Sequence, residues 1–109
     1  MERGDVVTIA AGGDPGEPRT AVIVQTDAFP PALGSVVVCR MTRDLVEAPD
    51  FRVTIEPRPG NGLAERVQVM ADKPVTVRRE RIGRRIGRLA GAEVARINVA
   101  LAFVMGLAD

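Results

Sequence analysis

Short apolar runs, separated by polar and turn-forming residues, follow one another along most of this chain. In residues 51–57, apolar and polar side chains alternate from Phe51 to Ile55, which is the period-two pattern of a strand with one buried face. Residues 19–25 and 35–41 are mostly β-branched and apolar, which favours central strands. The other runs that predict strands are 4–10, 66–73, a short segment at 74–77, and a last strand near 84–89.

Glycine and proline separate these runs, and a helical pattern ends the chain. Residues 11–18 hold three glycines and two prolines and predict a loop, while the double proline in 26–34 predicts a turn region. We expect a further turn or loop at 58–63 and a short helical turn at the start of the arginine-rich segment 78–89. Apolar residues three and four apart predict an amphipathic helix over 91–106. They are Val94, Ile97, Leu101 and Val104.

The order of these elements predicts one small β-rich domain that spans residues 1–109. Several short strands followed by one helix favour a small antiparallel barrel or strongly coiled sheet, with the helix covering one side. The chain is 46% hydrophobic, 27% charged and only 3% aromatic, so its core must be built from valine, isoleucine, leucine and alanine. A chain of this length supports a single modest core.

The composition excludes several kinds of chemistry. The chain has no histidine, which removes imidazole zinc sites and the catalytic triads and dyads that use a histidine base. Its one cysteine, Cys39, excludes an intramolecular disulfide and a thiolate metal site, and we expect a buried thiol in a strand. We therefore expect no metal or cofactor. No secretory segment or membrane-spanning run is found, so we expect a cytoplasmic protein.

Positive charge in this chain comes almost entirely from arginine. The net charge is only +1, and Lys73 is the single lysine among 15 basic residues. Arginine suits phosphate oxygens better than lysine does, although a coding bias explains the same composition. Six arginines between 78 and 88 form either an RNA-binding track or a solvated face. They are Arg78, Arg79, Arg81, Arg84, Arg85 and Arg88.

Five segments in order resemble the MazF/PemK family of toxin endoribonucleases. They are RGDVV (3–7), PRTAVIVQTDAF (18–29), VVVCRMT (36–42), the segment 62–89 that runs from GLAERV to RIGRL, and EVARINVALAFVMGL (93–107). Three positions depart from the family pattern. Thr20 replaces the usual proline, Thr8 stands where an aromatic is common, and Ala90 replaces the serine or threonine that usually caps the last helix, which costs about 1 kcal/mol.

The resemblance implies a fold, an activity and partners. The fold is a small SH3-like antiparallel β-barrel with a C-terminal helix, of the CcdB/PemK/MazF type. The activity is sequence-selective, metal-independent cleavage of single-stranded mRNA, in which the RNA's own 2′-hydroxyl attacks the phosphate and leaves a 2′,3′-cyclic phosphate and a 5′-hydroxyl. The protein is then the toxin of a type II toxin–antitoxin system, a homodimer that binds a cognate antitoxin and no membrane.

Two residues match the catalytic positions of the family. Arg19 stands directly before the apolar run 21–24, where it would clamp the phosphate oxygens, and its structural alternative is an ion pair with Glu17 or a position beside the barrel. Thr42 ends the strand that begins at 35, where its hydroxyl would contact the phosphate or the 2′-hydroxyl, and its alternative is a turn.

Further RNA contacts are predicted near these two residues. The glycines of loop 11–18, Gly13 among them, would permit closure over RNA, and Asp14 and Glu17 would accept hydrogen bonds from base edges. Arg43 is a candidate phosphate contact or a plain surface charge. For Asp72 and Lys73, which match a family feature, we favour a structural ion pair or turn.

Two other functions remain open at this stage. A CcdB-like toxin shares the barrel but binds DNA gyrase and cleaves nothing, through a C-terminal helix that ends in an exposed aromatic. Residues 104–109 contain no aromatic residue, which counts against that function. A barrel that only binds protein is the third possibility.

Overall fold

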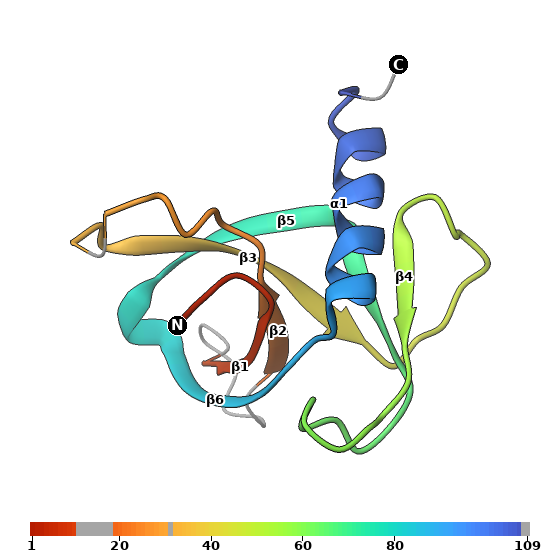
Figure 1. Cartoon of the computed structure of the whole chain (residues 1–109), viewed down its shortest axis with the longest axis horizontal. Coiled ribbons are helices and arrows are strands. Elements are labelled where there is room, and N and C mark those ends of the chain that lie inside the picture. Colours follow the sequence, from red (N-terminus) through yellow and green to blue (C-terminus); the bar gives the residue numbers. More distant parts are fainter. Residues whose placement is uncertain (11–18, 31, 108–109) are drawn as a thin grey trace.

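In the part of the chain that the structure describes, six strands form one antiparallel sheet and a single α-helix follows them (Figure 1). The computed structural model describes residues 1–10, 19–30 and 32–107. Within these ranges the order of strands across the sheet is β4-β5-β3-β2-β1-β6, so β4 and β6 stand at its two edges. The elements are β1 (Asp5–Ile9), β2 (Arg19–Ile23), β3 (Ser35–Thr42), β4 (Arg52–Ile55), β5 (Val67–Arg78), the 3₁₀ turn η1 (Arg79–Arg81), β6 (Ile82–Arg88) and α1 (Gly91–Val104).

The predicted fold class, an antiparallel β-rich domain with a C-terminal helix, is confirmed. One strand differs from the prediction in its length. The two strands expected at 66–73 and 74–77 are one long strand, β5, which curves across the molecule in Figure 1. Pro74 lies inside β5 opposite Cys39 of β3, next to a register shift. β4 pairs with β5 only from Val67 to Met70. Pro74 has no N–H to donate, but it lies beyond this paired segment, so no hydrogen bond to β4 is lost there.

Buried side chains lie on both faces of the sheet. The helix-side core is formed by residues of the sheet together with Ile97 and Ala100 of α1, and the second core lies on the opposite face. The alternation predicted for the strands is thereby confirmed, because neighbouring residues such as Ala21 and Val22 enter different cores. The second core comprises Val7, Ile9, Ala21, Ile23, Val36, Val38 and Ile82.

The single thiol lies in the helix-side core, as predicted. Cys39 is fully buried in β3, and burial raises its pKa to about 11. A thiol with this pKa holds very little thiolate near neutral pH, so Cys39 is a small apolar core residue and not a nucleophile.

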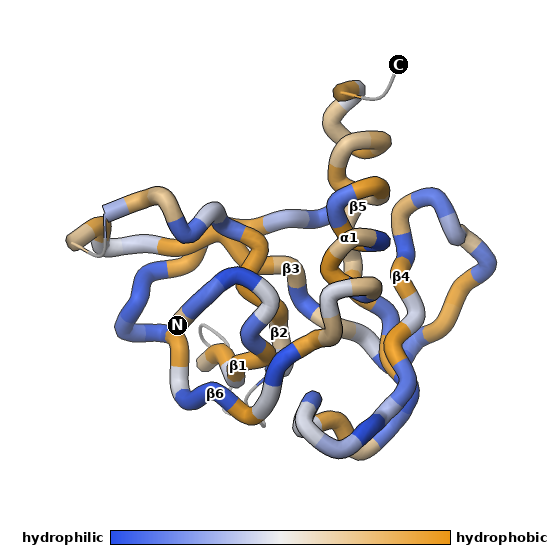
Figure 2. The backbone as a smooth tube through the Cα atoms, in the orientation of Figure 1, coloured by the Kyte–Doolittle hydropathy of each residue, from blue (hydrophilic) through white to orange (hydrophobic). Residues whose placement is uncertain are grey.

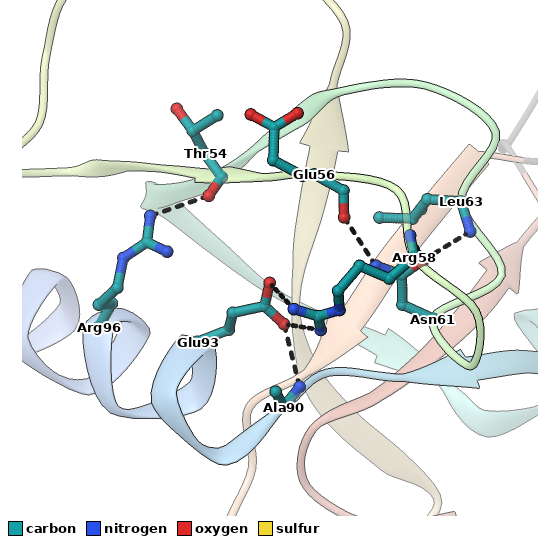
Figure 3. A network of polar contacts seen from close by, with 8 residues as sticks. All are labelled: Thr54, Glu56, Arg58, Asn61, Leu63, Ala90, Glu93 and Arg96. Carbon is teal, nitrogen blue, oxygen red and sulfur yellow. Dashed lines mark hydrogen bonds and ion pairs between the residues drawn. The ribbon is translucent and has the colours of Figure 1, made fainter.

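A carboxylate caps the first turn of α1, where Ala90 lacks the side-chain hydroxyl of a serine or threonine cap (Figure 3). Ala90 has no side chain that could cap the helix, but the Glu93 carboxylate accepts the Ala90 N–H at 3.0 Å. Arg58 donates two hydrogen bonds to the same carboxylate, at 2.5 and 3.0 Å. Half of a capping box is therefore present, and it fastens α1 to the loop before β5.

The C-terminal half of α1 is mostly apolar (Figure 2), and several of its apolar side chains are exposed. Val99 is 71% exposed and Phe103 is 48% exposed. Together with residues 46–50 and 52–54 they line an apolar groove of about 520 Å³, with Arg52 and Arg96 among its polar lining. None of the described helices is long and apolar enough to span a membrane.

Candidate functional site

Strand pairing places Arg19 and Thr42 beside each other. β2 and β3 are neighbours, and Ala21 pairs with Arg40 in their antiparallel register. Continuing that register along both strands sets Arg19 opposite Thr42. Residues opposite each other on neighbouring strands have Cβ atoms roughly 5 Å apart, so the guanidinium and the hydroxyl belong to one site.

Both residues line one open groove of about 600 Å³ at this end of the sheet. Arg19 is exposed at the start of β2, and Thr42 is partly buried at the end of β3. The groove therefore combines a cation, a hydroxyl and apolar wall residues that a base can contact. The remaining lining residues are Thr20, Met41, Arg43, Asp44, Gly62, Leu63, Ala64, Glu65, Val67 and Ile86.

The Thr42 hydroxyl makes a turn contact while its residue also lines the groove. Its oxygen accepts the Asp44 N–H at 3.0 Å, which is the turn contact expected of a threonine at a strand end. That bond uses an oxygen lone pair and leaves the hydroxyl proton to be donated. The turn fixes the side chain in the groove, where the same hydroxyl is able to donate to a ligand oxygen.

Arg43 lies in the groove in an ion pair with Glu65, at 3.2 Å. The two side chains are 73% and 58% exposed, so solvent screens their attraction and the pair holds Arg43 only weakly. An anionic ligand in the groove would compete with Glu65 for the guanidinium. The carboxylates of Glu65 and Asp44 also offer acceptors for the N–H groups of a base.

The other wall of the groove is a tightly packed glycine turn. Gly62 has a positive φ of 73°, and a Cβ at this position would lie 2.2 Å from the Ile86 carbonyl oxygen. The side chain of Asn61 is buried under the turn, where it donates to the Glu56 carbonyl at 2.9 Å and accepts the Leu63 N–H at 3.0 Å (Figure 3). The wall is therefore fixed by buried polar contacts.

Other predicted residues lie elsewhere or outside the described ranges. Gly13, Asp14 and Glu17, and with them the alternative ion pair of Arg19, fall in the segment that the structure does not describe. The carboxylate of Asp72 forms an ion pair with Arg52 at 2.9 Å, which agrees with the structural ion pair favoured for Asp72 and Lys73.

The arginine-rich segment is largely occupied with structural contacts. Arg85 and Arg88 both donate to the buried carboxylate of Asp5, at 3.1 and 2.7 Å. The Arg79 Nε donates to the Leu33 carbonyl at 2.6 Å. These three guanidinium groups fasten β6 and η1 to the rest of the chain, which disfavours a continuous RNA track along the segment.

Sequence analysis missed the residues that hold the site in place. Asn61, Arg58 and Glu93 were not singled out, since a loop assignment for 58–63 says nothing about what the loop packs against. The available signals were Glu93, three residues after a helix start, and the Pro-Gly-Asn-Gly sequence at 59–62.

The fold and the groove define a small β-rich protein in which two strand ends bring a guanidinium and a hydroxyl into one groove. A family model described as "PemK-like, MazF-like toxin of type II toxin-antitoxin system" matches residues 2–105, and the chain belongs to this family. A relative from Mycolicibacterium smegmatis, "Probable endoribonuclease MazF", is 41% identical over 109 residues and covers 99% of each chain.

Solved structures of similar proteins have the same fold. A mycobacterial endoribonuclease in complex with its cognate antitoxin aligns with a TM-score of 0.78 at 26% identity, over 98% of this chain and 96% of the other. The Mycobacterium tuberculosis toxin MazF-mt6 aligns with a TM-score of 0.79 at 20% identity, over 94% of this chain and 96% of the other.

Proposed function

We propose that this toxin is an endoribonuclease that cleaves single-stranded RNA in the groove containing Arg19 and Thr42. The observation that carries the proposal is the placement of a guanidinium opposite a hydroxyl in one groove, in a chain of the MazF-like toxin family. The relative from M. smegmatis that is 41% identical bears the name of an endoribonuclease, which supports the same activity here.

The proposed RNA cleavage requires from the protein a cation and a hydrogen-bond donor, which Arg19 and Thr42 supply. The 2′-hydroxyl of the RNA attacks the adjacent phosphorus and releases its proton to solvent. The bond to the 5′-oxygen of the next nucleotide breaks, this oxygen takes up a proton from solvent, and a 2′,3′-cyclic phosphate and a 5′-hydroxyl are formed. The Arg19 guanidinium donates to the non-bridging oxygens and stabilises the charge that grows on them as the fifth bond forms.

Thr42 orients the reacting groups. Its hydroxyl proton donates to a phosphate oxygen, while the Asp44 N–H keeps its oxygen in place. The guanidinium of an arginine is already protonated and has no acceptor for the 2′-hydroxyl proton, so its part is to donate a hydrogen bond toward the leaving 5′-oxygen. The chain has no histidine to take over the role of a general base.

The test is cleavage of a mixed RNA pool by purified protein in EDTA, with the ends of the products identified. We expect cutting to persist and to leave 2′,3′-cyclic phosphate and 5′-hydroxyl ends. The Arg19→Gln variant should cut at least about 100-fold more slowly with an unchanged circular dichroism spectrum. Loss of wild-type cutting on chelation, or full activity of Arg19→Gln, would contradict the proposal.

We further propose that the toxin forms a homodimer and binds a cognate antitoxin in the cytoplasm. A similar mycobacterial endoribonuclease was solved with its antitoxin, and the uncovered apolar groove beside α1 supports a protein interface. Sedimentation of the wild type and of a Val99→Glu variant measures the dimer, which the buried charge should weaken. An unchanged dimer in the variant would place the interface elsewhere.

The gyrase-binding alternative depends on an aromatic residue near the end of the helix. Phe103 lies one residue before the segment considered in the sequence and is half exposed, so the objection based on residues 104–109 does not hold. A gyrase poison would inhibit supercoiling and leave RNA intact, and Arg19→Gln would not affect it. Growth arrest with intact RNA would favour this alternative.

A further inference from the structure

Arg40 is an arginine whose burial is not compensated within the protein. It lies near the end of β3, two residues before Thr42, and is partly buried. Its Nε is buried, and no hydrogen-bond acceptor in the described part of the chain reaches it. A buried donor without a partner costs stability, so such a group calls for an explanation.

The strand alternation assigns Arg40 to the face that carries Arg19 and Thr42. Cys39 belongs to the helix-side core and Met41 packs against it, whereas Val38 belongs to the second core on the opposite face. Residues two apart on a strand share a face, so the side chains of Val38, Arg40 and Thr42 lie on one side of β3.

The register brings Arg40 within reach of the proposed catalytic pair. It pairs directly with Ala21, a residue with no side chain beyond Cβ, so β2 leaves room for a long side chain. Arg19 is then its diagonal neighbour on β2, at the spacing that long side chains bridge. The Cα atoms of Arg40 and Thr42 are roughly 6.6 Å apart along the strand.

We propose that Arg40 binds a phosphate of the RNA backbone next to the one that is cleaved. The proposal rests on the proposed function of the groove and adds a residue beside it, because Arg40 is not among the residues that line the groove. A phosphate oxygen would supply the acceptor that the Arg40 Nε lacks among the described residues, and arginine binds phosphate through two parallel N–H donors. Arg40 thereby fixes the register of the RNA strand against Arg19 and Thr42.

A salt titration of RNA binding tests this contact. The probe is an RNA oligonucleotide that contains a cut site mapped with the wild-type protein, synthesised with 2′-deoxyribose at the cut so that it stays intact. Each phosphate contact to single-stranded nucleic acid contributes about 0.7 to the slope of log K against log salt concentration. A merely structural arginine would not change that slope.

Three variants give the expected pattern. Arg40→Gln should weaken binding about 10-fold at low salt and reduce the slope by about 0.7, whereas Arg40→Lys should keep the slope because it keeps the charge. Arg3→Gln is the matched control, since Arg3 is also partly buried, donates to the Val24 carbonyl at 2.9 Å, and lines neither groove. An Arg40→Gln slope equal to that of the wild type and of the control would overturn the proposal.

Thermal unfolding separates this role from a structural one. Arg40→Met keeps the apolar stem and removes the buried N–H, so its unfolding midpoint should equal or exceed that of the wild type. A midpoint several degrees lower, with RNA binding unchanged, would show that Arg40 serves the fold and would overturn the inference.

Failure of the inference is distinguishable from failure of the proposed function. If Arg40→Gln binds like the wild type while Arg19→Gln has lost cutting, only the role of Arg40 is wrong. If Arg19→Gln cuts as fast as the wild type, the proposed catalytic site is wrong, and Arg40 loses its assigned role with it.

Discussion

Taken one at a time, the residues of the groove make contacts that are common in proteins. Their proposed chemistry depends on which side chains lie next to them. A threonine that accepts an N–H two residues later is common, and the described residues include such contacts at Thr42 and at Thr26. Of these two threonines, only Thr42 lines the groove that also contains Arg19. The same local contact is therefore a turn at one position and part of a proposed active site at the other.

Replacing Thr42 with valine removes the hydroxyl and keeps the shape of the side chain. We expect Thr42→Val to reduce RNA cleavage about 100-fold, because the phosphate loses a positioned donor. Thr42→Ser should retain most of the activity. The measurement is the single-turnover rate on an RNA with a mapped cut site.

Thr26→Val is the control for this prediction. It loses the equivalent hydrogen bond, from the Ala28 N–H at 3.2 Å, and its side chain lies outside the groove. Each variant should lose about 1 kcal/mol of stability, but only Thr42→Val should lose cleavage. Equal cleavage by the two variants would show that Thr42 acts only in its turn.

At the scale of elements, polar contacts between consecutive segments fix both the helix and the wall of the groove. Glu93 closes the first turn of α1 and binds Arg58, and Asn61 holds the turn that follows Arg58 (Figure 3). The turn at Gly62 packs against β6. The helix start, the loop and the groove wall therefore form one connected unit.

Adding the missing cap should stabilise the helix. In Ala90→Ser, the hydroxyl would accept the Glu93 N–H and complete the capping box that Glu93 already half forms. We expect a gain of about 1 kcal/mol, or roughly 4 °C in the thermal unfolding midpoint. Ala95→Ser makes the same chemical change at an exposed position inside α1 and should be slightly destabilising. Equal effects of the two would rule out a capping contribution.

The contact between β6 and the glycine turn leaves no space for a methyl group. A Cβ on Gly87 would lie 2.2 Å from the Asn61 carbonyl carbon, in backbone that cannot move aside without shifting the groove wall. Gly87→Ala should cost about 3 kcal/mol in urea unfolding. Gly34→Ala is the control, because a Cβ there has no neighbour within 4 Å. Similar midpoints for both variants would show that the turn is loosely packed.

At the scale of the whole molecule, a buried carboxylate links β1 to β6, the first and the last strand along the chain. Asp5 of β1 is 3% exposed and accepts hydrogen bonds from the Glu2 N–H, Arg85 and Arg88. Burial by itself would raise the pKa of Asp5, but these hydrogen bonds together outweigh it and hold the pKa below its ordinary value. The ionised form is therefore the one that stabilises the fold.

This shift makes stability depend on pH in a defined direction. A carboxyl with a lowered folded-state pKa contributes its full stabilisation above the unfolded pKa of about 4, and loses it as the pH falls through the folded value. Asp5→Asn should be about 3 kcal/mol less stable than the wild type at pH 7, and the gap should narrow below pH of about 4. Asp50→Asn, at an exposed carboxylate, is the control. A gap independent of pH would contradict the ionic role.

Much of the fold follows from local pattern. Period-two alternation predicted the strands, the three-and-four spacing predicted α1, and the similarity to MazF-like toxins pointed to Arg19 and Thr42. The division into two strands at 66–73 and 74–77 was wrong, because β5 continues through Pro74. The structure gives β5 no β4 neighbour at that point, and the sequence does not show which strands are neighbours.

The sequence by itself determined which segments form strands and which one forms the helix, since these preferences depend on neighbours along the chain. Its composition also determined which residue types are available for chemistry. Only the tertiary structure decided that Arg19 stands across from Thr42, that Arg40 shares their face, and that Asp5 is held by two arginines from the far end of the chain. The physical reason is that register and strand order come from pairing between distant segments. A change of one residue in register would turn every side chain of a strand to the other face.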